Sequence, residues 1–224
     1  MNITVAIDGP AGAGKSTVAK RLARSLGLVY VDTGSMYRAL TLGCVKKGFD
    51  PSSEVERTAS LAPTFDIKLT PDGKVFLDGQ DVSKEIRTPE ISRLTSPVSA
   101  IPAVRKTLVA MQRKMAESQG VVMDGRDIGT NVLPYASVKI FMIASPEVRA
   151  HRRYLEDVAK GIAADEKQIL SEINRRDYND THRAIDPLKA AADAVVLDTS
   201  NLDIDQVVAS ILRIVEEKVG VKHA

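Results

Sequence analysis

The sequence predicts an α/β fold: a parallel, doubly wound sheet flanked by helices. Short apolar runs recur along the chain and are typical of strands buried on both faces: residues 3–7, 29–31, 121–123, 138–144 and 194–197. Segments with helical spacing separate most of these runs. One segment, residues 59–80, differs: residues 65–69 alternate apolar and polar, the turn Pro71-Asp72-Gly73 follows, and residues 74–77 resume a strand-like pattern. We therefore expect an inserted subdomain that contains a β-hairpin.

The individual elements follow from local patterns. Residues 15–26 and 35–47 have helical spacing, and Gly27 and Gly48 are suited to end these two helices. Residues 65–69 and 74–77 form the predicted hairpin. The remaining predicted helices cover residues 83–86, 89–100, 102–119, 147–158, 165–176 and 204–219. Residues 95–97 are alternatively read as a turn before a helix, and Gly161 separates the helices on either side of it.

Composition excludes several classes of protein. The 224 residues suit one α/β core with inserted subdomains, and 44% are hydrophobic. A net charge of +2, with 4% aromatic residues and no Trp, argues against nucleic-acid binding. The single cysteine, Cys44, excludes a disulfide within the chain, and His151, His182 and His223 lie too far apart for metal-ligand spacing. With no signal peptide and no apolar run of transmembrane length, we expect a cytoplasmic protein that binds no membrane.

A phosphate-binding loop follows the first predicted strand. Residues 9–16 read GPAGAGKS, which has the spacing G-x-x-x-x-G-K-[ST], and a helical pattern follows directly. Glycines let backbone N–H groups curl around phosphate oxygens, and the helix N-terminus adds partial positive charge. Lys15 can reach the β- and γ-phosphates, and Ser16 can hold Mg²⁺. The sequence therefore predicts binding of a nucleoside triphosphate.

Polar segments follow three other predicted strands: residues 32–38, 124–127 and 198–200. Carboxyl ends of parallel strands meet at one edge of a sheet, so we expect all four segments to converge. Arginine binds phosphate through its planar fork, which makes Arg38 and Arg126 candidate ligands. Asp124 is either a carboxylate near Mg²⁺ or a helix N-cap, and we favour the cap or an indirect role. Two further clusters stand on predicted helical faces, or are simply solvated: Arg149, Arg152 and Arg153, and Arg176, Asp180 and Arg183.

Together these motifs resemble the bacterial cytidylate kinases, within the nucleoside monophosphate kinase group of P-loop proteins. The matching segments are GPAGAGKST at 9–17, DTGSMYR at 32–38, SPVSAIPAVR at 96–105, DGRDIGT at 124–130 and RDYNDTHRAIDPL at 176–188. The resemblance implies a CORE at about 1–34, 102–148 and 186–224, a monophosphate-binding domain at about 35–101 with the hairpin, and a short helical lid at about 149–185.

The same resemblance implies a reaction and a set of site residues. The γ-phosphoryl group of ATP would pass to CMP or dCMP with Mg²⁺, held largely through water at Ser16. The loop residues would bind ATP: Gly9, Pro10, Ala11, Gly12, Ala13, Gly14, Lys15, Ser16 and Thr17. Residues for the acceptor would be Arg38, Arg126 and Arg183 at the phosphate, Ser96, Arg105 and Asp127 at the cytosine, Asp180 at the ribose, and Thr33 and Tyr37 lining the pocket. Lys15, Arg126, Arg152 and Arg176 would act on the transferring group.

Two other functions remain open from the residues alone. A different small-molecule P-loop kinase, acting on another nucleotide or on a metabolite such as shikimate, would share the loop. A nucleotide-dependent switch would carry a guanine-reading N-K-x-D element, which the sequence lacks. We further expect the protein to act as a monomer.

Overall fold

The computed structural model describes residues 2–70 and 72–220, so that Pro71 of the predicted turn and His223 lie outside the described residues. The chain divides into two compact units. The first comprises Ile3–Leu28 and the chain from Val122, and the second comprises Val29–Val121. The functional division into CORE, monophosphate-binding domain and lid stays a prediction; by contacts, the helix after Pro102 belongs to the second unit.

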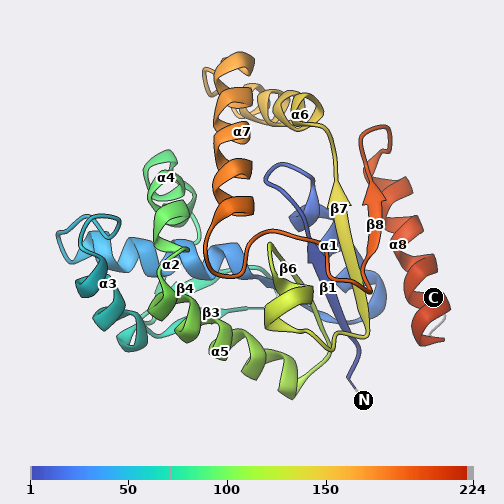
Figure 1. The fold of residues 1–224 in the computed structure, drawn as a ribbon, viewed down its shortest axis with the longest axis horizontal. Coiled ribbons are helices and arrows are strands. Elements are labelled where there is room, and N and C mark those ends of the chain that lie inside the picture. Colours follow the sequence, from blue (N-terminus) through green and yellow to red (C-terminus); the bar gives the residue numbers. More distant parts are fainter. Residues whose placement is uncertain (1, 71, 221–224) are drawn as a thin grey trace. The chain divides into compact units, whose positions relative to one another are not determined.

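A parallel five-stranded sheet in the order β2-β6-β1-β7-β8 forms the centre of the fold (Figure 1). Its strands are β1 (Thr4–Asp8), β2 (Val29–Asp32), β6 (Val121–Gly125), β7 (Val138–Ile143) and β8 (Val195–Asp198). β1 pairs with β7 from Val5↔Val138 to Asp8↔Phe141, and β7 pairs in parallel with β8. The predicted parallel α/β class is confirmed by this pairing. As expected of a parallel sheet covered by helices, β1, β6 and β7 are almost wholly buried.

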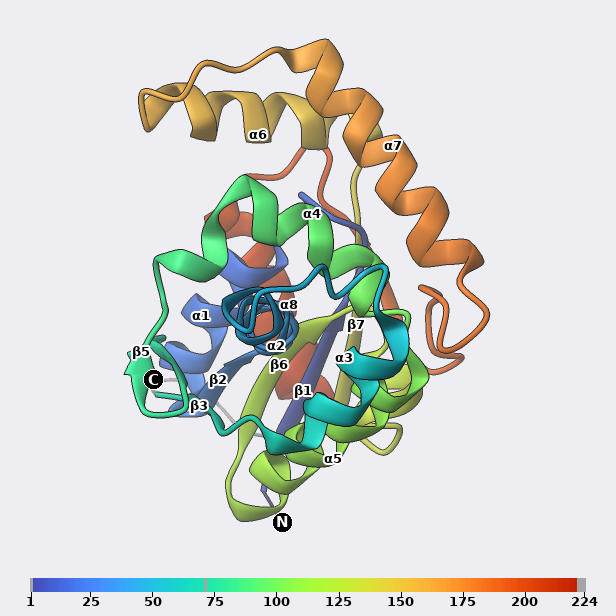
Figure 2. The ribbon, with the colours of Figure 1, turned by 90° about the vertical axis from the view of Figure 1, so that its left-hand side faces the viewer.

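The helices of the first unit are α1 (Lys15–Leu26), α6 (Pro146–Ala159), α7 (Glu166–His182) and α8 (Ile204–Val219). α1 and α8 pack on each other and on the sheet, while α6 and α7 form a pair joined through Gly161 (Figure 2). Local signals fix the ends: Gly27 adopts the left-handed conformation after α1, and Asp203 with Gln206 forms a capping box at the start of α8.

The second unit combines helices with a small antiparallel sheet in the order β3-β4-β5. Its elements after β2 are α2 (Thr33–Lys46), α3 (Val55–Leu61), the 3₁₀ turn η1 (Ala62–Thr64), β3 (Ile67–Leu69), β4 (Val75–Leu77), β5 (Gln80–Asp81), the 3₁₀ turn η2 (Glu85–Arg87), α4 (Pro89–Val98) and α5 (Pro102–Ser118). The predicted hairpin is present as β3 and β4.

Three predictions about elements were wrong in detail. Residues 55–61 form a helix that the pattern did not indicate. A third strand, β5, pairs with β4 where only a turn was expected. The predicted helix over residues 89–100 is present as α4, so residues 95–97 are helical and the alternative of a turn there is excluded. Helix α7 runs to His182, six residues beyond the predicted end.

Candidate active site

The loop between β1 and α1 has the backbone that a phosphate cradle requires. Gly9 has φ 147°, and a Cβ there would lie 2.1 Å from the carbonyl oxygen of Met142 on the neighbouring strand. Gly14 adopts φ 83° as it leads into α1. Only glycine combines these conformations with the close approach to β7. The free N–H groups at the start of α1 therefore lie at the end of β1, as the sequence predicts.

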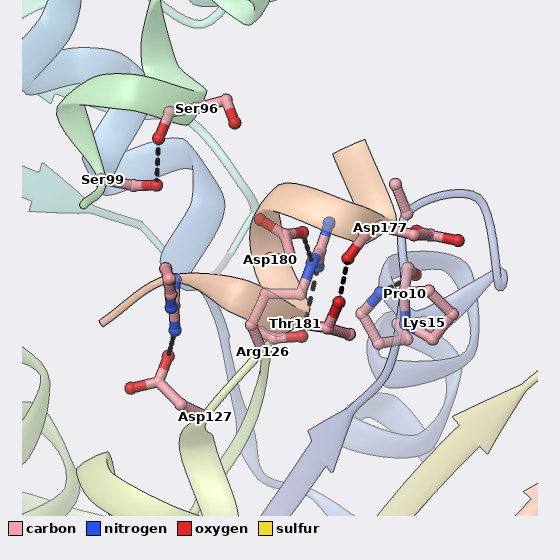
Figure 3. A network of polar contacts seen from close by, with 12 residues as sticks. Pro10, Lys15, Ser96, Ser99, Arg126, Asp127, Asp177, Asp180 and Thr181 are labelled. Atoms are coloured by element: carbon pink, nitrogen blue, oxygen red, sulfur yellow. Dashed lines mark hydrogen bonds and ion pairs between the residues drawn. The ribbon is translucent and has the colours of Figure 1, made fainter. Parts of the chain in front are cut away.

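Lys15 is buried and donates a hydrogen bond of 2.6 Å from Nζ to the carbonyl oxygen of Pro10 (Figure 3). Burial lowers the pKa of Lys15 well below its ordinary value, and the nearby Arg126 and Arg176 lower it further. The carboxylates of Asp124 and Asp8 act in the opposite direction. The loop therefore carries a concentration of positive charge that an anion would relieve.

Ser16 and Asp124 bring two oxygen ligands together. Ser16 Oγ donates to Asp124 Oδ2 over 2.7 Å, joining the first turn of α1 to the last residues of β6. Asp124 is not a helix cap, because it lies within the strand, and the indirect role that was also favoured stays a prediction. Hydroxyl and carboxylate oxygens suit Mg²⁺, which keeps several of its waters. No cluster of three or more His, Cys, Asp or Glu side chains among the described residues could hold a metal by itself.

Arg126 and Asp127 follow β6 and are tied to α7 and its C-terminal end. Arg126 Nε donates to Asp180 Oδ2 over 2.8 Å, the contact drawn in Figure 3. Arg183 Nη2 donates to Asp127 Oδ1 over 3.0 Å, and both side chains are buried. Burial raises the pKa of Asp180, but the guanidiniums of Arg126 and Arg176 outweigh it and leave that pKa below its ordinary value.

Arg183 does not share a helical face with Arg176 and Asp180, contrary to the prediction. The helix ends at His182, and Arg183 takes an extended backbone with φ −62° and ψ 141°. This bend turns the chain so that Arg183 Nε donates to the carbonyl oxygen of Asp186 while Nη2 reaches Asp127. The structure thus brings the predicted residues Arg126, Asp127, Asp180 and Arg183 together by a different local geometry.

The arginines of α6 have separate partners. Arg149 is buried and donates to the carbonyl oxygens of Ala144 and Ala11 and to Asp177 Oδ2. Arg152, which was predicted to act on the transferring group, donates to the carbonyl oxygens of Thr199 and Leu202 after β8. Arg149 is therefore the member of this cluster that contacts the phosphate loop, a role that helical spacing alone could not assign.

The second unit holds the predicted residues Arg38, Thr33, Tyr37, Ser96 and Arg105. Asp32 caps α2, accepting from Ser35 N at 2.8 Å, and it forms an ion pair with Arg38 at 3.3 Å. Arg38 Nη2 also donates to Ser35 Oγ over 2.7 Å. Burial raises the pKa of Asp32, but Arg38, the Ser35 hydrogen bonds and Arg87 together leave it lowered. Arg38 is thus fixed at the start of α2.

Four further predicted residues occupy three helices of this unit. Thr33 and Tyr37 are buried in α2. Ser96 lies in α4, where its carbonyl oxygen accepts from Ser99 Oγ at 2.8 Å. Arg105 is buried in α5 and its Nη1 lies 3.4 Å from the carbonyl oxygen of Ser99. Ser96 and Arg105 are therefore linked through one turn of backbone at residues 96–99.

The family model for cytidylate kinase matches residues 5–217, which include every site residue described above. The chain belongs to the cytidylate kinase family. It is 51% identical over 219 residues to a cytidylate kinase of Anoxybacillus flavithermus, covering 97% of each chain. It is 53% identical to one of Lactobacillus johnsonii, covering 96% of this chain and 94% of the relative.

The fold is shared more widely than the sequence. A solved structure of an uncharacterized protein from Eubacterium ventriosum matches with a TM-score of 0.52 at 14% identity, covering 97% of this chain and 99% of that one. Among the described residues of this cytidylate kinase family member, no helix has both the length and the apolar composition needed to cross a membrane.

Proposed function

We propose that the protein transfers the γ-phosphoryl group of ATP to CMP or dCMP, giving ADP and CDP or dCDP. Membership in the cytidylate kinase family over nearly the whole chain is the observation that carries this proposal. The phosphate loop with its buried Lys15 supplies the chemistry that the reaction needs. A nucleotide switch is disfavoured because the chain has no guanine-reading element.

The reaction is an in-line displacement in which a phosphate oxygen of the monophosphate attacks the γ-phosphorus and the bond to the ADP oxygen breaks. The attacking phosphate carries about two negative charges at neutral pH, so it needs no general base. The barrier is instead the repulsion between two anions. Lys15 is proposed to reduce this repulsion together with Arg126 and Arg176, whose charges both act on it.

ATP is proposed to bind at residues 9–17, with the backbone N–H groups of the loop and Lys15 directed at its phosphates. Ser16 and Asp124 are the residues that would hold Mg²⁺, largely through water. When bound, the ion would neutralise charge on the phosphate oxygens. Arg149 supports this loop by donating to the carbonyl oxygen of Ala11.

CMP is proposed to bind through the residues that the family resemblance implies. Arg38, Arg126 and Arg183 would bind its phosphate, Asp180 its ribose hydroxyls, and Thr33 and Tyr37 would line its pocket. Ser96, Arg105 and Asp127 would read the cytosine, with Asp127 accepting from the exocyclic amine that uracil lacks. Since Arg126 pairs with Asp180 and Arg183 with Asp127, substrate would replace or share these ion pairs.

Arg152 and Arg176 are proposed to bridge the transferring phosphoryl group when the lid closes. Arg152 would have to exchange the carbonyl oxygens of Thr199 and Leu202 for phosphate oxygens. Closure over both substrates would exclude water and suppress ATP hydrolysis. The cytoplasmic location and the monomeric state likewise remain predictions, the latter testable by light scattering.

A coupled assay of ADP release with ATP and Mg²⁺ tests the proposed function, with CMP, dCMP, UMP, AMP and GMP as acceptors in turn. We expect ADP to form quickly only with CMP or dCMP, and CDP or dCDP to be the product. ADP release that is independent of acceptor would indicate a hydrolase, and rapid turnover of AMP, GMP or a non-nucleotide acceptor would indicate a different kinase.

A further inference from the structure

Asp8 connects the end of β1 to a distant segment of the chain. It is 4% exposed and directly precedes Gly9 of the phosphate loop. Its Oδ1 accepts from Ile128 N and its Oδ2 from Gly129 N, each at 2.7 Å. Neither the spacing of 120 residues nor the apolar run before Asp8 indicates this contact in the sequence.

The backbone amides of Ile128 and Gly129 are the first two of a helical turn. Residues Ile128–Val132 form one turn of π-helix, and the residue at its N-cap position is Asp127. An aspartate at an N-cap ordinarily accepts from amides of its own first turn. Here the side chain of Asp127 makes no such bond, and Asp8 from β1 accepts from the first two amides instead.

Because Asp8 accepts from these amides, the Asp127 carboxylate faces other partners. Its Oδ1 accepts from Arg183 at 3.0 Å, and its Oδ2 accepts from Asn131 Nδ2 at 3.1 Å. Were Asp127 to accept from the first amides of its own turn, its carboxylate would rotate away from Arg183. The direction of Asp127 therefore depends on another group satisfying the amides of Ile128 and Gly129.

The packing around Asp8 is specific to this role. A Cβ at Gly129 would lie 3.2 Å from Lys139 Cδ and 3.4 Å from Asp8 Oδ2, so glycine keeps this approach open. The Lys139 amine is turned away, toward the carbonyl oxygen of Pro134 and Asp193. In the described ranges of the chain, the Asp8 side chain forms no ion pair. Its hydrogen bonds are the two that it accepts from the backbone N–H groups of Ile128 and Gly129.

Electrostatics agree with this geometry. Burial raises the pKa of Asp8 to about 6, and the carboxylate of Asp127 raises it as well. The amides of Gly129 and Ile128 and the charge of Lys15 oppose this rise. At neutral pH Asp8 is therefore mostly ionised and able to accept from both amides.

We propose that Asp8 is a positioning residue that caps the turn at Ile128–Val132 in place of Asp127, and so keeps the Asp127 carboxylate in the orientation from which it would read the acceptor base. Asp8 touches neither nucleotide in this role, and the role depends on the proposed cytidylate kinase activity. An asparagine at position 8 would keep one acceptor but turn an NH₂ group toward the second amide, leaving that buried amide unsatisfied.

The test compares wild type, Asp8→Asn, Asp127→Ala, the double variant and Asp203→Asn. The last is a matched control, because Asp203 also accepts from a backbone amide but at the start of α8. We expect Asp8→Asn to raise KM for CMP and to lower the ratio of kcat/KM for CMP over UMP by about tenfold, the effect of leaving one buried donor unsatisfied. KM for ATP should change by less than about threefold, since P-loop contacts are kept.

The double variant separates positioning from general destabilisation. If Asp8 acts through Asp127, then Asp8→Asn lowers the CMP/UMP ratio no further in the Asp127→Ala background. An equal loss in both backgrounds, or an equal loss in Asp203→Asn, would overturn the inference. If wild-type protein phosphorylates CMP and Asp8→Asn keeps the wild-type ratio of kcat/KM for CMP over UMP, the role of Asp8 is overturned and the proposed function is not. Wild-type protein that phosphorylates no CMP would overturn the proposed function and, with it, this role of Asp8.

A measurement on the wild-type protein covers the case in which Asp8→Asn does not fold. The backbone amide proton resonances of Ile128 and Gly129 should move together with one midpoint near the pKa of Asp8, about 6. Amide resonances that do not titrate between about pH 5 and 7 would overturn the capping contact, whatever the activity of the protein.

Discussion

Replacing Lys15 by methionine separates the chemistry of the site from the stability of the fold. Methionine keeps the aliphatic stem and removes the charge. In the structure the Lys15 ammonium is buried, donates to a neutral carbonyl oxygen at 2.6 Å, and lies near two arginines that lower its pKa. Its charge is therefore available to a phosphate oxygen, because no carboxylate among the described residues forms a direct ion pair with it.

The expected loss of activity follows from that position. Removing one preorganised donor from a buried site costs about 10²–10³ in kcat, or about 2.7–4 kcal/mol. We expect a loss of this size in kcat for CMP phosphorylation, measured by coupled ADP release with saturating ATP. Lys20→Met, an exposed lysine of the same helix, is the control and should stay within about twofold of wild type.

Stability should respond in a different way. The lowered pKa means that folding opposes the charge on Lys15, so its removal offsets the lost hydrogen bond to Pro10, worth about 1 kcal/mol. The Tm of Lys15→Met without nucleotide should therefore lie within about 4 °C of wild type. Wild-type kcat in this variant would refute the assignment of Lys15 to the phosphates. A Tm lower by more than about 10 °C would show that its charge supports the fold instead.

Three other changes should have distinct effects. Asp127→Ala should reduce the preference for CMP over UMP by about tenfold or more, seen in the ratio of kcat/KM values, because the exocyclic amine loses its acceptor; an unchanged ratio would remove Asp127 from base recognition. Gly9→Ala should lower Tm and abolish activity, since its Cβ would meet the Met142 carbonyl oxygen at 2.1 Å; a folded, active variant would contradict the loop geometry. The pKa of Asp8, raised from 3.8 to about 6, contributes stability that is fully present below pH 3.8 and is lost as pH rises through 6. The free energy of unfolding of wild type relative to Asp8→Asn should therefore fall by about 2.5 kcal/mol between pH 4 and 7, measured by urea denaturation, and a constant difference would contradict it.

The sequence predicted the parts of the fold that have strong local signals. Apolar runs marked the five strands of the main sheet, and Lys15–Leu26 was predicted with the ends that the structure shows. The elements that were missed are short. β5 has two residues, both exposed, so no alternation could mark it. The helix Val55–Leu61 has only seven residues and no side-chain cap at Glu54.

The candidate site shows the same limit. Contacts within one motif, such as the phosphate loop, could be predicted because the residues that make it are adjacent. The contact of Asp8 with Ile128 and Gly129 could not be predicted, because an aspartate at the end of a strand does not indicate which distant backbone amides it will contact. Arg183 was predicted to lie on the helical face because the helical spacing was continued to residue 183. In the structure its ψ of 141° is not helical, and the helix ends at the preceding residue.

The two buried charges beside the loop show why such a site is not optimised for stability alone. Lys15 has its pKa lowered and Asp8 has its pKa raised, so the fold disfavours the charged form of both. Each partly relieves the other, since Lys15 lowers the pKa of Asp8 and Asp8 raises that of Lys15. A neutral pair would be less costly to bury, but a neutral residue 8 could not accept from two amides and a neutral residue 15 could not counter a phosphate. The stability that these charges cost is thus tied to two separate proposed roles, Asp8 holding the backbone at Ile128 and Lys15 binding the γ-phosphate. If both roles hold, a variant at Asp8 should alter the choice of base and a variant at Lys15 the rate of transfer.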